Sequence, residues 1–266
     1  MIPRAAITAW RANAPWSTDE QVEQDLAICR ALIDIFSLDD LASQLAIRGG
    51  TALHKLFLTP ASRYSEDIDL VQVEAGPIGP VMTVLRAQLD PWLGKPTWKQ
   101  SAGRVTFYYR FDSESPPITR MRLKVEICTR EHFTVLGLIS RDLVVENSWF
   151  SGTEPIVTYR LEELLATKLR ALYQRKRGRD LFDLALALER EPELNLEAIA
   201  EGFRCYLTNE GLKVSRTEFE QNLDEKLADP RFGKDVEALL STEGLAESFD
   251  VPGAARAVKS ALLARI

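Results

Sequence analysis

The stretch IRGGTALHKLFLTPASRYSEDIDLV, residues 47–71, combines a glycine pair with two aspartates on an apolar strand. Successive side chains of a strand point to opposite faces, so Asp67 and Asp69 share one face and lie roughly 6–7 Å apart. Two carboxylates there repel each other and resist desolvation unless a cation lies between them. Mg²⁺ meets that requirement, because it binds carboxylate oxygens together with phosphate oxygens. A simple solvated strand face is the alternative.

A second predicted strand, 120–127, repeats the pattern. Its apolar residues form one face, and Arg122, Lys124 and Glu126 form the other. If this strand neighbours the first, Glu126 becomes a third carboxylate at the same centre, and three carboxylates holding two metal ions suit an in-line phosphoryl or nucleotidyl displacement. Alternatively, Arg122 and Lys124 are simply ion-pair partners of Glu126.

The glycine pair lies directly upstream of the aspartates. Gly49 and Gly50 follow a short apolar run, and Thr51 is predicted to cap a short helix over 52–58, which Pro60 ends. Adjacent glycines before a helix expose backbone N–H groups to a phosphate, and the helix dipole assists. A plain tight turn also uses two glycines, so this feature gains its meaning from the acidic strand that follows.

A second informative stretch, residues 160–189, carries a lysine inside an apolar helix face. Lys168 falls in the middle of an arc of leucines, where it either snorkels to solvent or meets a buried anion such as a nucleotide phosphate. The basic segment Arg175–Arg179 follows. It is either a solvated helix end or the place where this chain binds a phosphate-rich partner.

Two further aspartates follow the basic segment. Asp180 and Asp183 are three residues apart on a helix that is apolar nearly all round, so they share a face and need partners. Asp180 is a candidate helix cap. For Asp183, the natural partners are Lys168 and nearby arginines, or else a catalytic site.

The predicted elements change in type along the chain. Residues 1–155 are predicted to form an α/β domain and residues 156–266 a helical domain. The predicted strands are 45–47, 67–73, 104–111, 120–127 and 143–145. The predicted helices are 18–37, 52–58, 81–93, 160–176, 179–190, 195–207, 216–228, 234–241 and 253–265.

Composition narrows the class of protein. The 266 residues include 45% hydrophobic and 27% charged residues and carry a net charge of −6, as in a globular protein that is not a general nucleic-acid binder. No apolar run approaches the roughly 20 residues of a membrane span, and no signal peptide is evident, so we expect a cytoplasmic protein with no membrane partner. Three scattered cysteines and two histidines argue against disulfides and structural zinc.

Three blocks of residues occur in an order typical of one known family. They are Gly49-Gly50-Thr51-Ala52 with Arg63-x-Ser65-x-Asp67-Ile68-Asp69-Leu70, then Leu164-x-x-x-Lys168-Leu169-x-Ala171-x-x-x-Arg175, and Arg179-Asp180-Leu181-x-Asp183-Leu184. Together they resemble the AbiEii/AbiGii toxin family, which includes the MenT toxins of the nucleotidyltransferase superfamily. The resemblance runs from about residue 45 to 190, and the C-terminal helices carry no specific motif.

The resemblance implies a bilobed toxin. An α/β nucleotidyltransferase-like lobe with a mixed sheet and an all-helical lobe would enclose the active site. Such proteins are the toxin halves of bacterial type IV toxin–antitoxin or abortive-infection pairs and inhibit growth. MenT-like members transfer a nucleotide from an NTP to the tRNA acceptor end and so block translation. Mg²⁺ or Mn²⁺, NTP, tRNA bound at the basic segment and a protein antitoxin similar to AbiEi are the implied cofactors and partners.

Roles carry over residue by residue. The resemblance implies that Asp67 and Asp69 hold the metal and that an aspartate of the third block, either Asp180 or Asp183, completes the catalytic set. The residues implied to contact the NTP are Gly49, Gly50, Thr51, Arg63, Ser65 and Lys168. Glu126 as a third metal ligand rests on the strand pattern and not on the resemblance, and Arg63 has pairing with Glu66 as its alternative.

Other functions remain open on the same fold. The nucleotide acceptor is tRNA or, alternatively, a protein side chain or small molecule, which the identity of the labelled species in a lysate distinguishes. A non-catalytic interaction module would not bind NTP with Mg²⁺. A kinase-like toxin would transfer the γ-phosphate of the NTP and not its α-phosphate.

Overall fold

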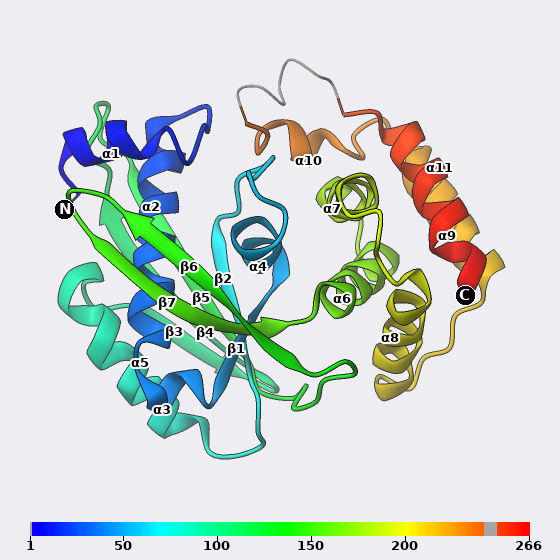
Figure 1. The fold of residues 1–266 in the computed structure, drawn as a ribbon, viewed down its shortest axis with the longest axis horizontal. Helices are drawn as coiled ribbons and strands as arrows, with labels where there is room; N and C mark the ends of the chain where they lie inside the picture. Colours follow the sequence, from blue (N-terminus) through cyan, green and yellow to red (C-terminus); the bar gives the residue numbers. More distant parts are fainter. Residues whose placement is uncertain (1, 242–248) are drawn as a thin grey trace. The chain divides into compact units, whose positions relative to one another are not determined.

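The computed structural model describes residues 2–241 and 249–266, and the chain divides into two compact units (Figure 1). The first unit consists of Met1–Phe133 and Leu138–Tyr159, and the second of Thr134–Gly137 and Arg160–Ile266. The first is an α/β unit and the second is helical. Within the described residues, no helix has both the length and the apolar character that crossing a bilayer requires.

A seven-stranded mixed sheet organises the first unit, in the order β3-β4-β5-β2-β1-β7-β6. β2 is parallel to β5 and β1 is parallel to β7, whereas the other neighbours are antiparallel. The strands are β1 (Leu45–Arg48), β2 (Asp67–Gln72), β3 (Thr97–Ser101), β4 (Arg104–Asp112), β5 (Arg120–Cys128), β6 (Leu138–Glu146) and β7 (Ser151–Tyr159).

Helices cover the two faces of this sheet unequally. α2, α3 and α5 lie on one side, and α4 lies on the other, over β1 and β2 (Figure 1). The helices of this unit are α1 (Arg4–Trp10), α2 (Asp19–Phe36), α3 (Asp39–Ala42), α4 (Gly49–Leu56) and α5 (Ile78–Leu93). The predicted start of α2 is confirmed, because Thr18 and Gln21 form a reciprocal capping box there.

The register of the sheet decides which side chains meet. β2 pairs with β5 so that Asp67 stands opposite Lys124 and Asp69 opposite Glu126. The expectation that the two acidic strands are neighbours is therefore confirmed. The alternate residues of both strands are buried on the face that α2 covers, so hydrophobic burial fixes which face the carboxylates occupy.

The second unit is built from helices with small connecting loops. α6 packs against α7 and α8, and α11 packs against α7. Its elements are α6 (Leu161–Gln174), α7 (Gly178–Arg190), α8 (Leu196–Asn209), α9 (Arg216–Leu227), α10 (Lys234–Glu237), α11 (Val251–Ala261) and a final 3₁₀ turn (Leu263–Arg265). The predicted helix over 234–241 is shorter than expected, because α10 ends at Glu237.

Two local predictions are wrong for clear physical reasons. Thr51 does not cap a helix over 52–58, because α4 already begins at Gly49 and the Thr51 hydroxyl donates to the Asp67 carbonyl and accepts from the Ser65 hydroxyl. No strand is predicted beyond 143–145, but β7 continues through Pro155 to Tyr159. β1 pairs with β7 only at Thr158, so the missing N–H of Pro155 interrupts no hydrogen bond on that side.

Candidate active site

Three carboxylates of the first unit converge on one ammonium group. Lys124 Nζ lies 3.2 Å from Asp67 Oδ2, 3.5 Å from Glu126 Oε2 and 4.0 Å from Asp69 Oδ1. β2 supplies the two aspartates, and β5 supplies the lysine and the glutamate from the same face of the sheet. The cation that the two aspartates require is therefore present in the chain itself, as the side chain of Lys124.

In this cluster, burial disfavours the charged forms of the side chains, whereas the ion pairs favour them. Desolvation raises the pKa of Asp67, and the neighbouring Asp69 adds to this, while Lys124 counteracts it. For Lys124, burial favours the neutral amine, but Asp69, Asp67 and Glu126 together outweigh it and raise the pKa of the ammonium. The cluster thus holds one positive charge tightly among three acidic groups.

The cluster has the donor chemistry of a magnesium site, because hard carboxylate oxygens point toward one position that a cation already occupies. Among residues 2–241 and 249–266, no group of three or more His, Cys, Asp and Glu side chains is arranged so that it could hold a metal ion. The space between the three carboxylates holds the Lys124 ammonium. A divalent ion held by Asp67, Asp69 and Glu126 would therefore have to displace the Lys124 ammonium.

This geometry predicts that Lys124→Met binds Mn²⁺ more tightly than the parent protein. A unit charge about 4 Å from a site near the surface interacts by up to roughly 4 kcal/mol, so removing it should raise the affinity at least tenfold. Electron paramagnetic resonance of free Mn²⁺, without nucleotide, measures the change. Lys95→Met, an equal change of charge at an exposed loop position, is the control. Unchanged or weaker Mn²⁺ binding by Lys124→Met would contradict competition between lysine and metal.

The glycine pair lies directly beside these carboxylates. Gly49 has a φ of +81°, and a Cβ there would lie 2.6 Å from Asp69 Oδ2. A Cβ on Gly50 would lie 2.6 Å from Arg63 Nη2 and 3.0 Å from Ser65 Oγ. A side chain at either glycine would collide with these groups. The Asp69 carboxylate and the Arg63 guanidinium can therefore lie close to the backbone of α4 only because both residues are glycines.

Three polar side chains lie close to the glycine pair at the first turn of α4, namely Arg63, Ser65 and Thr51. Arg63 is buried and donates to the carbonyl of Tyr64, and Thr51 Oγ1 lies 2.9 Å from Ser65 Oγ. All the residues that the sequence nominated for phosphate contact in the first unit thus gather around the first turn of α4. His54 is buried on the same helix.

We expect Gly49→Ala to lower the nucleotide transfer that the resemblance implies far more than its cost in stability explains. A left-handed backbone costs an alanine about 1–2 kcal/mol, and the new methyl group must also displace the Asp69 carboxylate. Gly94→Ala is the matched control, because Gly94 has a φ of +78° with no atom within 4 Å of its would-be Cβ. Urea unfolding should show a loss of stability for both variants, whereas only Gly49→Ala should lose transfer. Equal activity of the two variants would contradict the assigned role of Asp69.

A second ionic cluster lies in the helical unit. Lys168 Nζ lies 2.8 Å from Asp183 Oδ2 and 3.3 Å from Asp180 Oδ1, and Arg175 Nε lies 2.7 Å from Asp180 Oδ2. The side chains of Asp180 and Asp183 are 0% exposed, and that of Lys168 is 7% exposed. Lys168 therefore does not snorkel, and the buried anions it meets are the two aspartates.

The charges of this cluster stabilise one another. Desolvation opposes ionisation of Asp180, but Lys168 and Arg175 outweigh it and lower the pKa of that carboxyl. Asp180 is the third residue of α7 and does not cap it. Asp235 caps it instead, because its carboxylate accepts a hydrogen bond from Gly178 N. The sequence around α7 does not predict this role for Asp235, because Asp235 lies 57 residues from Gly178 along the chain.

The basic segment Arg175–Arg179 is partly neutralised by the chain. Arg175 pairs with Asp180, and Lys176 Nζ lies 2.6 Å from Asp229 Oδ2. Its positive charge is consequently smaller than the sequence suggests.

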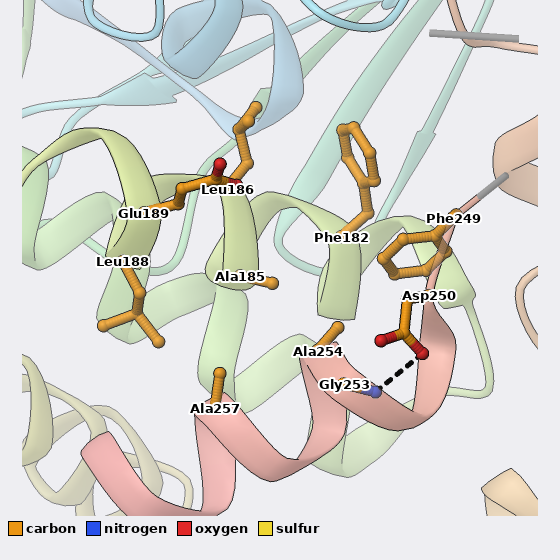
Figure 2. Close-up of a pocket in the computed structure, with 10 residues that line it drawn as sticks. All are labelled: Phe182, Ala185, Leu186, Leu188, Glu189, Phe249, Asp250, Gly253, Ala254 and Ala257. Carbon is orange, nitrogen blue, oxygen red and sulfur yellow. Dashed lines mark hydrogen bonds between the residues drawn. The ribbon is translucent and has the colours of Figure 1, made fainter. Parts of the chain in front are cut away.

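A separate apolar hollow of about 390 Å³ lies between α7 and α11. Figure 2 shows Phe182 and Phe249 at one end of it and Asp250, which accepts a hydrogen bond from Gly253 N. None of the residues nominated from the sequence lines this hollow.

Comparison with known proteins shows the family of the chain. The chain matches the model of the family described as "Nucleotidyl transferase AbiEii toxin, Type IV TA system" over residues 30–257. No curated protein matches the sequence significantly.

Several solved structures share the fold, among them the following two. One is MenT4, a nucleotidyltransferase toxin from Mycobacterium tuberculosis H37Rv, with a TM-score of 0.67 and 15% identity over 100% of this chain and 91% of that one. The other comes from H. pylori and is assigned as a nucleotidyltransferase, with a TM-score of 0.56 and 18% identity over 91% of this chain and 93% of that one. With the family match over most of its length, this chain belongs to the AbiEii family of nucleotidyltransferase toxins of type IV toxin–antitoxin systems.

Proposed function

We propose that this toxin transfers a nucleotide from an NTP to the acceptor end of tRNA, with Mg²⁺ as cofactor, and so blocks translation in the cytoplasm. The observation that carries the proposal is the convergence of Asp67, Asp69 and Glu126 beside the glycine turn of α4. A metal–triphosphate substrate needs carboxylates to bind the metal and, next to them, backbone N–H groups that its phosphates can reach.

The residues of the first unit divide the work of binding. Asp67, Asp69 and Glu126 would hold Mg²⁺ (or Mn²⁺), which, when bound, neutralises phosphate charge and activates the attacking hydroxyl. The first turn of α4, from Gly49 to Thr51, presents backbone N–H groups to the triphosphate. Arg63 and Ser65, which lie against Gly50, orient its oxygens.

The proposed reaction is a displacement at the α-phosphorus of the NTP. The terminal hydroxyl oxygen of the RNA forms a new P–O bond, the bond to the bridging oxygen of pyrophosphate breaks, and the hydroxyl proton passes to solvent. Catalysis by this chain then consists of positioning and charge stabilisation, as is general for phosphoryl transfer.

The helical unit contributes the remaining proposed catalytic residues. We propose that Lys168 exchanges an aspartate oxygen for a triphosphate oxygen when the nucleotide binds, and that Asp180 and Asp183 hold the lysine ready for this exchange. Their ion pairs with Lys168 support the proposal. The basic segment Arg175–Arg179 helps to attract the polyanionic tRNA, and a protein antitoxin similar to AbiEi restrains the toxin.

A lysate experiment tests the proposed acceptor. The purified toxin, a bacterial lysate and each of the four NTPs, labelled in turn at the α- and γ-phosphate, should give α-label in the tRNA fraction with at least one nucleotide. Label from the γ-phosphate would instead indicate a kinase. Label on protein or on a small molecule would overturn the tRNA assignment while leaving a nucleotidyltransferase.

A further inference from the structure

The outer strands of the sheet carry a strongly basic surface. Lys99 on β3, Arg104 and Arg110 on β4, and Arg122 on β5 are all exposed, and with Tyr108 they form what we call the basic face. Strand pairing places Lys99 opposite Thr106 and Thr106 opposite Glu126, so the basic face and the carboxylate cluster share one side of the sheet. In a chain of net charge −6, this concentration of cations indicates a polyanionic ligand.

An aromatic ring lies at the centre of these cations. Arg122 Cζ is 5.3 Å, Arg110 Cζ 5.9 Å and Lys99 Nζ 5.9 Å from the centroid of the Tyr108 ring. The surface beside the ring is hollowed by about 350 Å³, between Arg104, Arg122 and Lys124. An aromatic ring surrounded by cations is the arrangement that stacks a nucleobase and holds its phosphates.

The cations of the basic face are largely available to a ligand. Throughout the described residues, no carboxylate lies within ion-pair distance of Lys99, Arg110 or Arg122, and Arg104 reaches only Glu126, at 3.4 Å. By contrast, two cations of the Arg175–Arg179 segment already have aspartate partners. The basic face is therefore the better electrostatic site for nucleic acid.

We propose that the basic face binds the single-stranded 3′ end of the acceptor RNA, with Tyr108 stacked on a base and the cations at the phosphates. This inference rests on the proposed function. Tyr108 on β4 is two strand spacings from Asp67 on β2, about 10 Å. That distance corresponds to about three stacked nucleotides, so a strand held at Tyr108 brings its terminal hydroxyl to the carboxylates.

Two other anions fit the surface less well. A triphosphate is compact and suits the first turn of α4, whereas these cations are spread over three strands. An acidic protein would pair with the cations, but carboxylates alone would not explain the aromatic ring of Tyr108 among three of them. The affinities of the variants for NTP and for a poly-glutamate peptide test these two alternatives.

Fluorescence anisotropy with a 5′-labelled single-stranded RNA, in EDTA and without NTP, tests the proposal independently of catalysis. Tyr108→Ala should weaken binding at least about fivefold, and Tyr108→Phe should bind as the parent does, because stacking needs only the ring. The double variant Arg110→Gln/Arg122→Gln should lower the slope of log K against log salt by about 1.4. The control is Arg216→Gln/Arg256→Gln, which removes two exposed charges of the helical unit.

The outcomes separate this inference from the proposed function. If Tyr108→Ala and the arginine double variant bind RNA as the control does, the basic face is not the RNA site, even when α-label still reaches tRNA. If they lose affinity for NTP or for a poly-glutamate peptide but keep it for RNA, the inference is equally overturned. Failure of the parent protein to label tRNA under any condition would instead refute the proposed function. Circular dichroism confirms that each variant is folded.

Discussion

Asp67→Asn is expected to abolish nucleotide transfer while leaving the protein folded. The variant keeps the shape of the side chain but removes a charge of the proposed metal site, which should lower the rate by at least about 1000-fold, or roughly 4 kcal/mol of transition-state stabilisation. Folding should not suffer, because burial raises the pKa of Asp67 and its charged form is unfavourable in the native state. Transfer of α-labelled NMP and thermal unfolding measure the two effects.

Asp112→Asn is the matched control for this variant. Asp112 lies on β4, is 59% exposed and pairs only with Arg120 among the described residues, so the same change of charge should affect neither transfer nor stability by much. Full transfer activity in Asp67→Asn would show that the carboxylate cluster is not the catalytic centre. A large loss of stability would show that Asp67 serves the fold.

The second large effect is expected on stability, in the helical unit. Asp180→Ala removes a common partner of Lys168 and Arg175 but leaves the buried Lys168 paired with Asp183, so it should reduce the free energy of unfolding by about 1.5–3 kcal/mol. Urea unfolding measures this loss. Glu220→Ala breaks the exposed pair with Arg216 on α9 and should cost less than about 1 kcal/mol. Similar costs for the two variants would mean that the buried cluster does not stabilise the fold.

The pH dependence of stability gives an independent check on Asp180. Its pKa is lower in the folded protein than in the unfolded chain, where a carboxyl titrates near 4. The stabilisation is therefore fully present above pH 4 and is lost as the pH falls through the folded pKa. In Asp180→Ala, the unfolding free energy should fall less steeply over that acid range. Parallel curves for the parent and the variant would contradict the assignment.

The sequence predicted those elements that bury an alternating or helical apolar face. β2 and β5 were predictable because each buries alternate residues, and α6 because its leucines follow helical spacing. β3 was missed because all five of its residues are exposed, so that no burial pattern exists in them. β7 was missed because Pro155 resembles a strand end unless the extent of β1 is known.

The same reasoning explains what was predictable in the candidate site. Alternation along β2 and β5 placed Asp67, Asp69 and Glu126 on common faces, and the pairing of the strands brings them together. That Lys124 would lie among all three carboxylates depends on the register between strands, which the sequence of either strand does not contain. The basic face also depends on strand pairing and was not predicted, because its cations come from three strands and lie together only in the folded sheet.

We propose that the carboxylate cluster transfers a nucleotide to the 3′ end of RNA. The most direct measurement incubates the purified toxin with Mg²⁺, α-labelled NTP and tRNA that ends in either a 3′-hydroxyl or a 3′-deoxynucleotide. We predict label only on the hydroxyl-ended tRNA, with pyrophosphate released in equal amount, and none with Asp67→Asn. Equal labelling of both RNAs would show that the 3′-hydroxyl is not the acceptor, and labelling that persists in Asp67→Asn would show that the carboxylate cluster is not the catalytic centre.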